Sequence, residues 1–549
     1  MPAGLLNWAW RADDAASQDA RPHADAGGSS ARPGSWSMTE PTRTIRRPAG
    51  SRSEPSVPRD GVGDTTGPPP RRPPSGRRTR RPWIDGHLAL VAILVVAAAI
   101  RVGGAWAGSP CVITNEESES RAALADGRCV SFNDSATYVT NVNYNADGRW
   151  FQTRGPEGRT VDSALHAPMF ATALTPLAWF GIDDYEELRY AVALLGVGGV
   201  AMVHLLGVAI AGRRAGLIAA ALAAVHPLIW INDVVLMPEG MFAVAVAGVA
   251  VVAYRFADER TAVRAAHLGL AIGAASLVRN EALLTLAFIG LPLLSRVWTR
   301  SPRDAARCGA ALVAGAAVVL APWVGFNWAR FDRPLLTHGV GAGLRASTCD
   351  ETFYNERLLG LRSIDCLALD REETSEPGND SEAARSRIYQ ANALEYYGDN
   401  LGRAPTVVLA RVARFWGLWR PLETIRLDDV IEQRGAVRAQ VGLLVTYPLL
   451  PVSVYGGVVL WRRRVPLSPL LGWVGSATVV AAASQPLQRF RIGGDVALVV
   501  LAGVGLAAAV NLPLVQRLAG LAGDPAPPPR RAQRPMPSPP STGSTAPVT

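Results

Sequence analysis

The feature that most constrains this chain is a series of long apolar runs separated by short arginine-rich connectors. The runs are roughly 18–22 residues long, which is the length an α-helix needs to cross the hydrocarbon core of a bilayer. Buried strands of a soluble α/β protein would instead be runs of about 4–8 residues bounded by turns. With 49% hydrophobic and 18% charged residues, the chain is predicted to be an all-α polytopic membrane protein.

The hydropathy pattern predicts about ten transmembrane helices, with both termini on the cytoplasmic side. The expected spans are 88–107, 188–210, 214–231, 235–254, 264–279, 281–296, 308–328, 441–461, 467–484 and 494–514. In this arrangement the arginine-rich connectors all face the cytoplasm, where basic residues are enriched. The pair 264–279 and 281–296 is short for two spans, so one broken or re-entrant hairpin is the alternative.

Polar tails and two long loops complete the expected organisation. Residues 1–84 and 516–549 are rich in proline and arginine, and such segments are expected to be disordered cytoplasmic tails. The catalytic membrane core is expected at 85–328, with a first external loop at 108–187, and the C-terminal helices at 441–515. A second external loop is expected at 329–440, with an amphipathic interfacial helix at 406–420.

The net charge of +9 does not indicate a nucleic-acid partner, because the arginines lie in tails and connectors rather than on one basic face with interleaved aromatics. The bilayer is the partner that the charge pattern predicts. The chain contains no lysine and is rich in alanine, arginine, glycine and valine. This composition is typical of a high-GC genome, such as that of an actinobacterium, so a bacterial plasma membrane is the expected location.

Four of the five cysteines lie in the two loops that are placed outside. Cys111 and Cys129 are in the first loop, and Cys349 and Cys366 are in the second, whereas Cys308 begins an apolar run. Two pairs confined to external loops indicate two disulfides in an oxidising compartment. Four unpaired loop cysteines are the alternative.

The first external loop carries two candidate functional residues. Asp134 could take a proton from an acceptor hydroxyl or help to ligate a cation, although Asn-Asp-Ser before an Ala-Thr-Tyr-Val run is also good helix-capping chemistry. His166 could bind substrate or a metal. It precedes Pro168 and an apolar run, so a histidine at headgroup level before an interfacial helix is the structural alternative.

Charged residues at the ends of apolar runs supply further candidates. Glu239 follows Pro238 at the outer end of a span, where a carboxylate is either a site residue or a solvated helix start. Arg279 and Glu281 are flanked by apolar runs on both sides. Arginine suits bidentate phosphate binding, and a local ion pair closing a turn is the alternative.

Arg489 and Arg491 form a basic cluster on the outer side, where the positive-inside rule disfavours arginine. Such an exception indicates an anionic partner, which could be a substrate or the lipid headgroups. No Walker loop, dinucleotide-binding glycine motif, zinc-type Cys/His spacing or serine nucleophile elbow occurs. The site is therefore expected to use few groups and an activated donor made elsewhere.

Taken together, these motifs resemble the GT-C type polyprenyl-phosphate-sugar glycosyltransferases, in the branch of the protein O-mannosyltransferases and lipid A aminoarabinose transferases. Residues 134–138, from Asp134 to Tyr138, resemble that family's acidic motif in the first external loop. Residues 166–170 resemble its His-Pro-Pro-Leu-Tyr-like segment, with Ala167 in place of the first proline. Residues 277–281 resemble its Arg-x-Glu turn, and residues 488–491 a late arginine-rich motif.

The resemblance implies a GT-C type helical bundle that transfers a sugar, such as mannose or arabinose, from a polyprenyl-phosphate donor on the extracytoplasmic face, with inversion. Asp134 would be the base, and Arg279, Arg489 and Arg491 would stabilise the leaving phosphate. Tyr138, His166, Glu239 and Glu281 would contact the substrates. No cofactor is certain, and a divalent cation shared by Glu239 and His166 is left open.

The acceptor, whether a glycan, a lipid or a protein, is not indicated by the sequence. Two other functions remain open, namely a transporter or flippase of a lipid-linked saccharide and a non-catalytic membrane scaffold. Internal repeats are a common feature of transporters. The two halves of this chain show no such repeat, which counts against the transporter.

Overall fold

The structure is a computed structural model, and it describes residues 82–107, 134–154, 159–376, 378–379, 381–432 and 434–510. Both expected tails and most of the first external loop lie outside these residues. So do Cys111 and Cys129, and with them the disulfide expected in the first loop.

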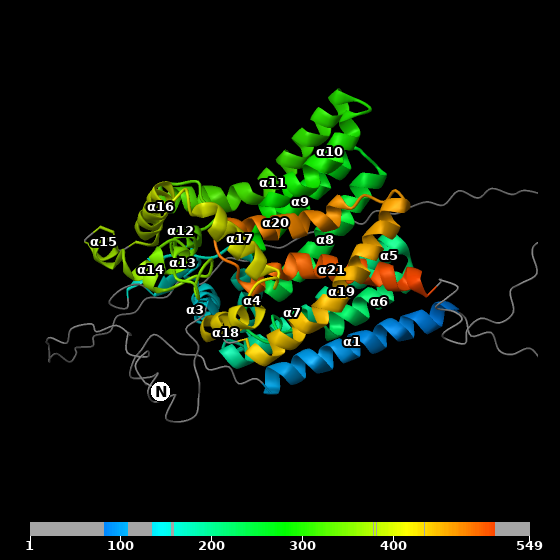
Figure 1. Cartoon of the computed structure of the whole chain (residues 1–549), viewed down its shortest axis with the longest axis horizontal. Coiled ribbons are helices and arrows are strands. Elements are labelled where there is room, and N and C mark those ends of the chain that lie inside the picture. The colour runs from blue at the N-terminus through cyan, green and yellow to red at the C-terminus, as the bar shows by residue number, and fades with distance from the viewer. Residues whose placement is uncertain are drawn as a thin grey trace, which may run out of the picture. The chain divides into compact units, whose positions relative to one another are not determined.

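The described part of the chain is mostly helical, as the sequence predicts. Seven of its helical segments are long and apolar enough to cross a membrane. They are α1 (Pro82–Ala107), α5 (Tyr185–Ala211), α8 (Glu239–Asp258), Asn280–Trp298, α11 (Pro302–Phe331), α19 (Ala436–Arg462) and Gln488–Ala509. Three shorter apolar helices accompany them, namely α4 (Met169–Ala178), α9 (Ala262–Val278) and α20 (Ser468–Ala483). Figure 1 shows the long helices running side by side.

The predicted span at 214–231 is broken in the structure. Helix α6 (Arg213–Val225) has 13 residues, which at about 1.5 Å per residue is too short for the hydrocarbon core. It ends at His226, and Pro227 begins the single turn α7 (Pro227–Trp230). The next eight residues are irregular and buried. Irregular backbone at membrane depth is tolerated where protein surrounds it, so α8 begins at Glu239 rather than at the expected 235.

The pair of segments around Arg279 is also irregular. Helix α9 ends at Val278, and Arg279 has an extended backbone. The following segment consists of the 3-10 helix η2 (Asn280–Leu284), the π-helix η3 (Leu286–Gly290) and α10 (Leu291–Trp298). The second half of the predicted pair is therefore a continuous but irregular helical segment, and Arg279 lies at the junction.

The surface of the bundle carries the side chains that a bilayer would solvate. Aliphatic residues of the long helices point outward, and tryptophans lie exposed at their ends. The tryptophans are Trp106, Trp298, Trp328 and Trp461, and such aromatic side chains are enriched at both membrane interfaces. The innermost segment ends the described chain: η4 (Gln488–Arg491) leads into α21 (Ile492–Ala509), and most of this segment is buried.

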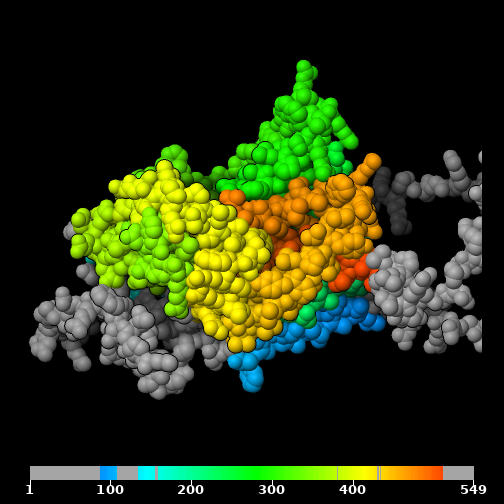
Figure 2. Space-filling view, viewed as in Figure 1, coloured from blue at the N-terminus to red at the C-terminus, as the bar shows by residue number. Residues whose placement is uncertain are grey.

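The second long loop, which the sequence predicts to lie outside, folds into a body of short helices. These are α12 (Gly339–Arg345), α13 (Asp350–Phe353), α14 (Asp365–Ala368), α15 (Arg371–Ser375), α16 (Glu382–Asp399), α17 (Ala404–Phe415) and α18 (Pro421–Glu432). A disulfide joins Cys349 to Cys366 within it. Figure 2 shows this body, in yellow-green and yellow, packed beside the orange C-terminal helices.

The helix expected at 406–420 is α17, and it ends at Phe415 instead. Its buried face includes Arg411 and Arg414, whose guanidinium groups donate hydrogen bonds to backbone carbonyls of neighbouring segments. Gly417, with a φ of 70°, turns the chain after the helix. The position of α17 at a membrane interface remains a prediction.

The described part of the first loop holds α3 (Asp134–Ala146) and a two-stranded antiparallel hairpin, β1 (Gln152–Arg154) and β2 (Thr160–Asp162). The second loop holds the segment between β2 and α4 in place. The backbone N–H groups of His338 and Gly339 donate to the carbonyls of Ala164 and Leu165, over 2.8 and 3.2 Å. Glu382 of α16 accepts hydrogen bonds from the Ala164 backbone and from the preceding serine. The two loops thus position His166 together.

Candidate functional site

Asp134 is the first residue of α3, where a carboxylate interacts favourably with the positive end of the helix dipole. Its Oδ2 accepts a hydrogen bond of 2.8 Å from Nη2 of Arg489, and its Oδ1 lies 3.5 Å from Nε2 of His166. About 35% of the Asp134 side chain remains exposed. The carboxylate is therefore held in place and is still reachable from outside the protein.

The neighbours of Asp134 keep it ionised. Burial acts to raise the pKa of Asp134, but the charges of Arg489 and His166 and their hydrogen bonds outweigh it and hold this pKa well below its usual range. Asp134 is thus a carboxylate at neutral pH and has the charge state that a general base requires.

Tyr138, one turn along α3, is buried beneath the site. Its ring lies 4.8 Å from the imidazole of His166 and meets Phe170 edge-on at 4.9 Å. Burial, together with the charges of Asp134 and Glu239, raises the pKa of Tyr138, so the phenol stays protonated. In the structure, Tyr138 packs against the ring of His166 and supports it. A role of Tyr138 in substrate binding remains a prediction.

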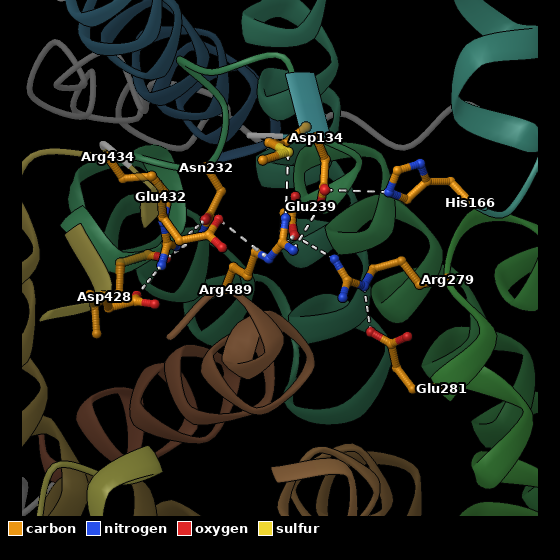
Figure 3. Close-up of polar contacts among 12 residues, drawn as sticks. Asp134, His166, Asn232, Glu239, Arg279, Glu281, Asp428, Glu432, Arg434 and Arg489 are labelled. Atoms are coloured by element: carbon orange, nitrogen blue, oxygen red, sulfur yellow. Dashed lines mark hydrogen bonds and ion pairs between the residues drawn. The ribbon is translucent and has the colours of Figure 1, made fainter. Parts of the chain in front are cut away.

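Arg489 is the centre of the site, and Figure 3 shows carboxylates converging on it from three other elements. Besides its hydrogen bond to Asp134, its Nε lies 3.5 Å from Glu432 Oε2 and 3.9 Å from Glu239 Oε1. The sulfur of Met237 is 3.6 Å from Nη1. Residues from α3, α8, α18 and η4, far apart in the sequence, therefore meet at one guanidinium group.

Arg279 lies beside this centre and shares one of its carboxylates. Its guanidinium donates hydrogen bonds to both Glu239 and Glu281. The ring of Phe490 packs 4.7 Å from the guanidinium carbon, a cation–π contact that keeps the planar group in place. The extended backbone of Arg279, between α9 and η2, is what lets its side chain reach across to the start of α8.

The three carboxylates around Arg489 differ in their access to solvent. The side chains of Glu239 and Glu432 are 1% and 3% exposed, against 35% for Asp134. A buried carboxylate that loses its cation is destabilised strongly, whereas an exposed one regains water. An incoming anion that binds Arg489 would therefore displace Asp134 in preference to the two glutamates.

The residues expected to share a divalent cation do not fit one as they are arranged. The Oε1 atom of Glu239 is occupied by Arg279 and lies near Arg489, and Nε2 of His166 faces Asp134. A metal ion at Glu239 would lie against two guanidinium groups, which repel it. Within the described ranges, no group of three or more His, Cys, Asp or Glu side chains could hold a metal ion.

Arg491 lies apart from this centre. It is buried, its Nη2 donates to Asp495 over 2.9 Å, and the ring of Trp416 packs 5.0 Å from its guanidinium carbon. The 3-10 helix directs Arg489 and Arg491 to different neighbours. Binding of a phosphate by Arg491 remains a prediction, and the contacts described for Arg491 are structural.

A partly open hollow adjoins His166. It is lined by polar, aromatic and aliphatic side chains, among them Asn141, Asn145, Ser163, His166, Phe151 and Trp323. Within the described part of the chain, Asn141 Oδ1 and His166 Nδ1 are buried without a hydrogen-bond partner. The hollow thus offers hydrogen-bonding atoms next to the Asp134–His166 contact.

Sequence reasoning missed several charged residues of the site, all from the second loop or next to it. Glu432 contacts Arg489, and Arg362 donates a hydrogen bond of 2.6 Å to Glu432. Nearby, Arg434 donates to both Asp428 and Asn232 over 2.8 Å. The one signal available was the acidic run Asp428-Asp429-Val-Ile-Glu432 just before a span, and by itself it reads as a solvated helix face.

Comparisons with known proteins give only distant structural likenesses. No protein-family model and no curated protein matches the sequence. Two structures of an oligosaccharyltransferase from Archaeoglobus fulgidus, in the apo form and with an inhibitory peptide and a dolichol-phosphate, match 80% of this chain. Their sequence identities are 14% and 16%, and their TM-scores are 0.46 and 0.44. This chain covers 53% and 52% of those structures, about half of their length.

A third structure, ArnT from Cupriavidus metallidurans bound to undecaprenyl phosphate, is matched over 78% of this chain and 79% of that one, at 14% identity and a TM-score of 0.36. All three TM-scores lie below 0.5, so the function proposed below is based on the residues of the site.

Proposed function

We propose that this protein is an integral membrane glycosyltransferase. It moves a sugar, mannose, arabinose or a relative, from a polyprenyl-phosphate donor to an acceptor hydroxyl on the extracytoplasmic face, with inversion at the anomeric carbon. The observation that carries this proposal is the meeting of an accessible, ionised carboxylate with two arginines at one place. A general base and phosphate-binding cations are what such a transfer needs.

In the proposed reaction, Asp134 takes the proton of the acceptor hydroxyl as its oxygen attacks the anomeric carbon. The bond between that carbon and the donor phosphate oxygen breaks, and its electron pair leaves with the lipid phosphate. Inversion requires one base on the face opposite the leaving group, by the same geometry as in inverting hydrolases. A base in this role contributes about 10²–10⁴-fold to the rate.

Arg489 and Arg279 stabilise the charge that grows on the leaving phosphate. Arginine presents a rigid fork of donors that suits phosphate, and pre-positioned cations in a site that excludes water stabilise such charge strongly. Because Arg489 is already paired with carboxylates, the donor phosphate gains it by displacing Asp134, the exposed partner. Donor binding in this way frees the base at the moment it is needed.

The acceptor approaches from the side of His166 and the adjoining hollow. Asn141 Oδ1 and His166 Nδ1 have no hydrogen-bond partner among the described residues, and acceptor hydroxyl groups would satisfy them. The aromatic rings of Phe151 and Trp323 line the same hollow. The chemistry of this surface suits a hydroxyl-bearing acceptor, whether a glycan, a glycolipid or a protein side chain.

A flippase of lipid-linked saccharides is the second candidate, because it would also use arginines at the outer membrane surface. The accessible carboxylate favours the enzyme, since flipping requires no base. The substitution Asp134→Asn keeps the size of the side chain and removes its basicity. It should abolish sugar transfer but leave flipping or a scaffold role intact, so it distinguishes the three functions.

The experiment offers radiolabelled polyprenyl-phosphate mannose and polyprenyl-phosphate arabinose to membranes from cells with the wild type, Asp134→Asn or no protein. We expect label to move into a glycan, lipid or protein fraction with the wild type. Asp134→Asn should reduce this transfer by about 10²-fold or more, because the base is lost.

Asp147→Asn is the matched control. Asp147 follows the same helix, α3, but is exposed, and its ion-pair partner among the described residues is the nearby Arg149, so transfer by this variant should equal that of the wild type. Equal transfer by the wild type and Asp134→Asn would remove Asp134 as the base. Saccharide flipping that survives in Asp134→Asn, without transfer by the wild type, would favour the flippase.

A further inference from the structure

Glu432 lies at the end of α18 and carries a buried negative charge into the site. Its side chain is 3% exposed, with Oε2 3.5 Å from Nε of Arg489 and Oε1 accepting a hydrogen bond of 2.6 Å from Arg362. Glu432 thus stands between two guanidinium groups and competes with Asp134 for one of them. This competition gives the second loop a direct electrostatic link to the proposed base.

Arg362 reaches Glu432 from the loop that the Cys349–Cys366 disulfide closes. Its side chain is about 18% exposed, so its charge is only partly screened by water. Charges of alternating sign therefore follow one another from the second loop to the site, in the order Arg362, Glu432, Arg489 and Asp134 (Figure 3 shows the last three).

We propose that Glu432 and Arg362 are positioning residues that set how strongly Arg489 is available to the donor phosphate and to Asp134. Neither residue touches a reacting atom. Glu432 draws part of the positive charge of Arg489 away from the site, and Arg362 limits this effect by neutralising Glu432. The inference rests on the proposed function, because it concerns the same phosphate-binding arginine.

Other charged and titratable groups also face Asp134 among the described residues. His166 faces it from the segment before α4, Arg489 from η4 and Tyr138 from its own helix. Glu239 of α8 reaches it through Arg489, together with Arg279. Glu432 and Arg362 differ from all of these in belonging to the second loop, so their effect can be removed without altering a group that contacts Asp134.

Two substitutions should act in opposite directions. Glu432→Gln removes the competing negative charge, so the full-length protein in nanodiscs should bind undecaprenyl phosphate about two- to tenfold more tightly. Arg362→Gln removes the positive charge that pairs with Glu432, so Glu432 should attract Arg489 more strongly and binding should weaken by a similar factor. Arg362→Gln should also move the acid limb of the pH–rate profile to higher pH, because Glu432 then draws Arg489 away from Asp134.

Glu432→Asp and Asp370→Asn provide the controls. Glu432→Asp keeps the charge and should restore binding to near the wild-type value. Asp370→Asn breaks another buried ion pair in the second loop, with Arg345 and at a distance of 2.7 Å. It should lower the unfolding temperature without changing the affinity for undecaprenyl phosphate, which separates loss of fold from loss of charge.

Opposite shifts by Glu432→Gln and Arg362→Gln, with thermal unfolding measured for each variant, would support the proposal. Shifts in the same direction, or none beyond those of Asp370→Asn, would overturn it while leaving the glycosyltransferase in place. A wild type that neither binds undecaprenyl phosphate nor transfers sugar would overturn the proposed function and this inference together.

Discussion

In this structure Asp134 is held firmly in place, but its low pKa makes it a weak base. The same contact that fixes its position, the hydrogen bond from Arg489, also lowers its pKa and therefore its strength as a base. The donor phosphate resolves this conflict in the proposed mechanism, because it competes for Arg489. The free protein and its donor complex should then differ in the pKa of Asp134.

This difference predicts two distinct pH profiles. A carboxylate base is active when ionised, so the rate falls as pH falls through its pKa. The profile of kcat/KM for the donor reports the free protein, and that of kcat reports the complex. We therefore expect the acid limb of kcat to lie at higher pH than that of kcat/KM, by about one unit or more.

Initial rates between about pH 4 and about pH 8, at saturating acceptor, measure both limbs. Arg489→Met supplies the comparison, since removal of the guanidinium should bring the two limbs together while transfer falls. Coincident limbs in the wild type would contradict the displacement of Asp134 by the donor.

At the scale of elements, close helix contacts depend on glycine. A Cβ atom at Gly456 of α19 would lie 2.0 Å from the carbonyl oxygen of Leu501 in α21, whereas a Cβ atom at the neighbouring Gly457 would meet nothing within 4 Å. Small residues let membrane helices approach closely and gain van der Waals contact. The position of α21, and of Arg489 just before it, follows from this packing.

Gly456→Ala should therefore destabilise the protein by about 1–3 kcal/mol, because the added methyl group forces α19 and α21 apart. Gly457→Ala is its neighbour on the same helix and should leave stability unchanged or raise it by up to about 1 kcal/mol, since alanine is the better helix former. Thermal unfolding in detergent compares the two variants. Equal losses from both would show that the close approach at Gly456 is not what holds α19 and α21 together.

At the scale of the whole molecule, the proposed function requires the site and both long loops to lie outside the cell. The arginine-rich connectors follow the ends of the long helices opposite to the second loop, and exposed tryptophans lie at both ends. The positive-inside rule then places the connectors in the cytoplasm.

Cysteine substitution tests this orientation. Glu372 lies on the exposed face of α15, and Arg300 lies in the exposed connector between α10 and α11, so each can be replaced by cysteine. A membrane-impermeant maleimide should label the first in intact cells and the second only after permeabilisation, with the wild type reporting the background of the native cysteines. The reverse pattern would place the site in the cytoplasm and contradict the use of an external donor.

Much of the helical architecture could be predicted from hydropathy, because a bilayer requires long apolar runs with internally satisfied backbones. Most of the long helices begin and end within a few residues of their expected bounds, as α5 at Tyr185–Ala211 does for 188–210. The failure at 214–231 has a physical cause. Hydropathy depends on the apolar side chains around Pro227, and these are typical of a span. It carries no information on the backbone, which is irregular there and is buried by the surrounding protein.

The candidate site divides in the same way. A charge in an apolar context is visible in the sequence, and this singled out Asp134, Glu239, Arg279 and Arg489, which the structure brings together. Glu432 and Arg362 lie in a polar loop where charges are ordinary, so nothing local marks them. The contact of Glu432 with Arg489, and that of Arg362 with Glu432, depend on how the second loop folds back over the helix ends, and only the tertiary structure decides that.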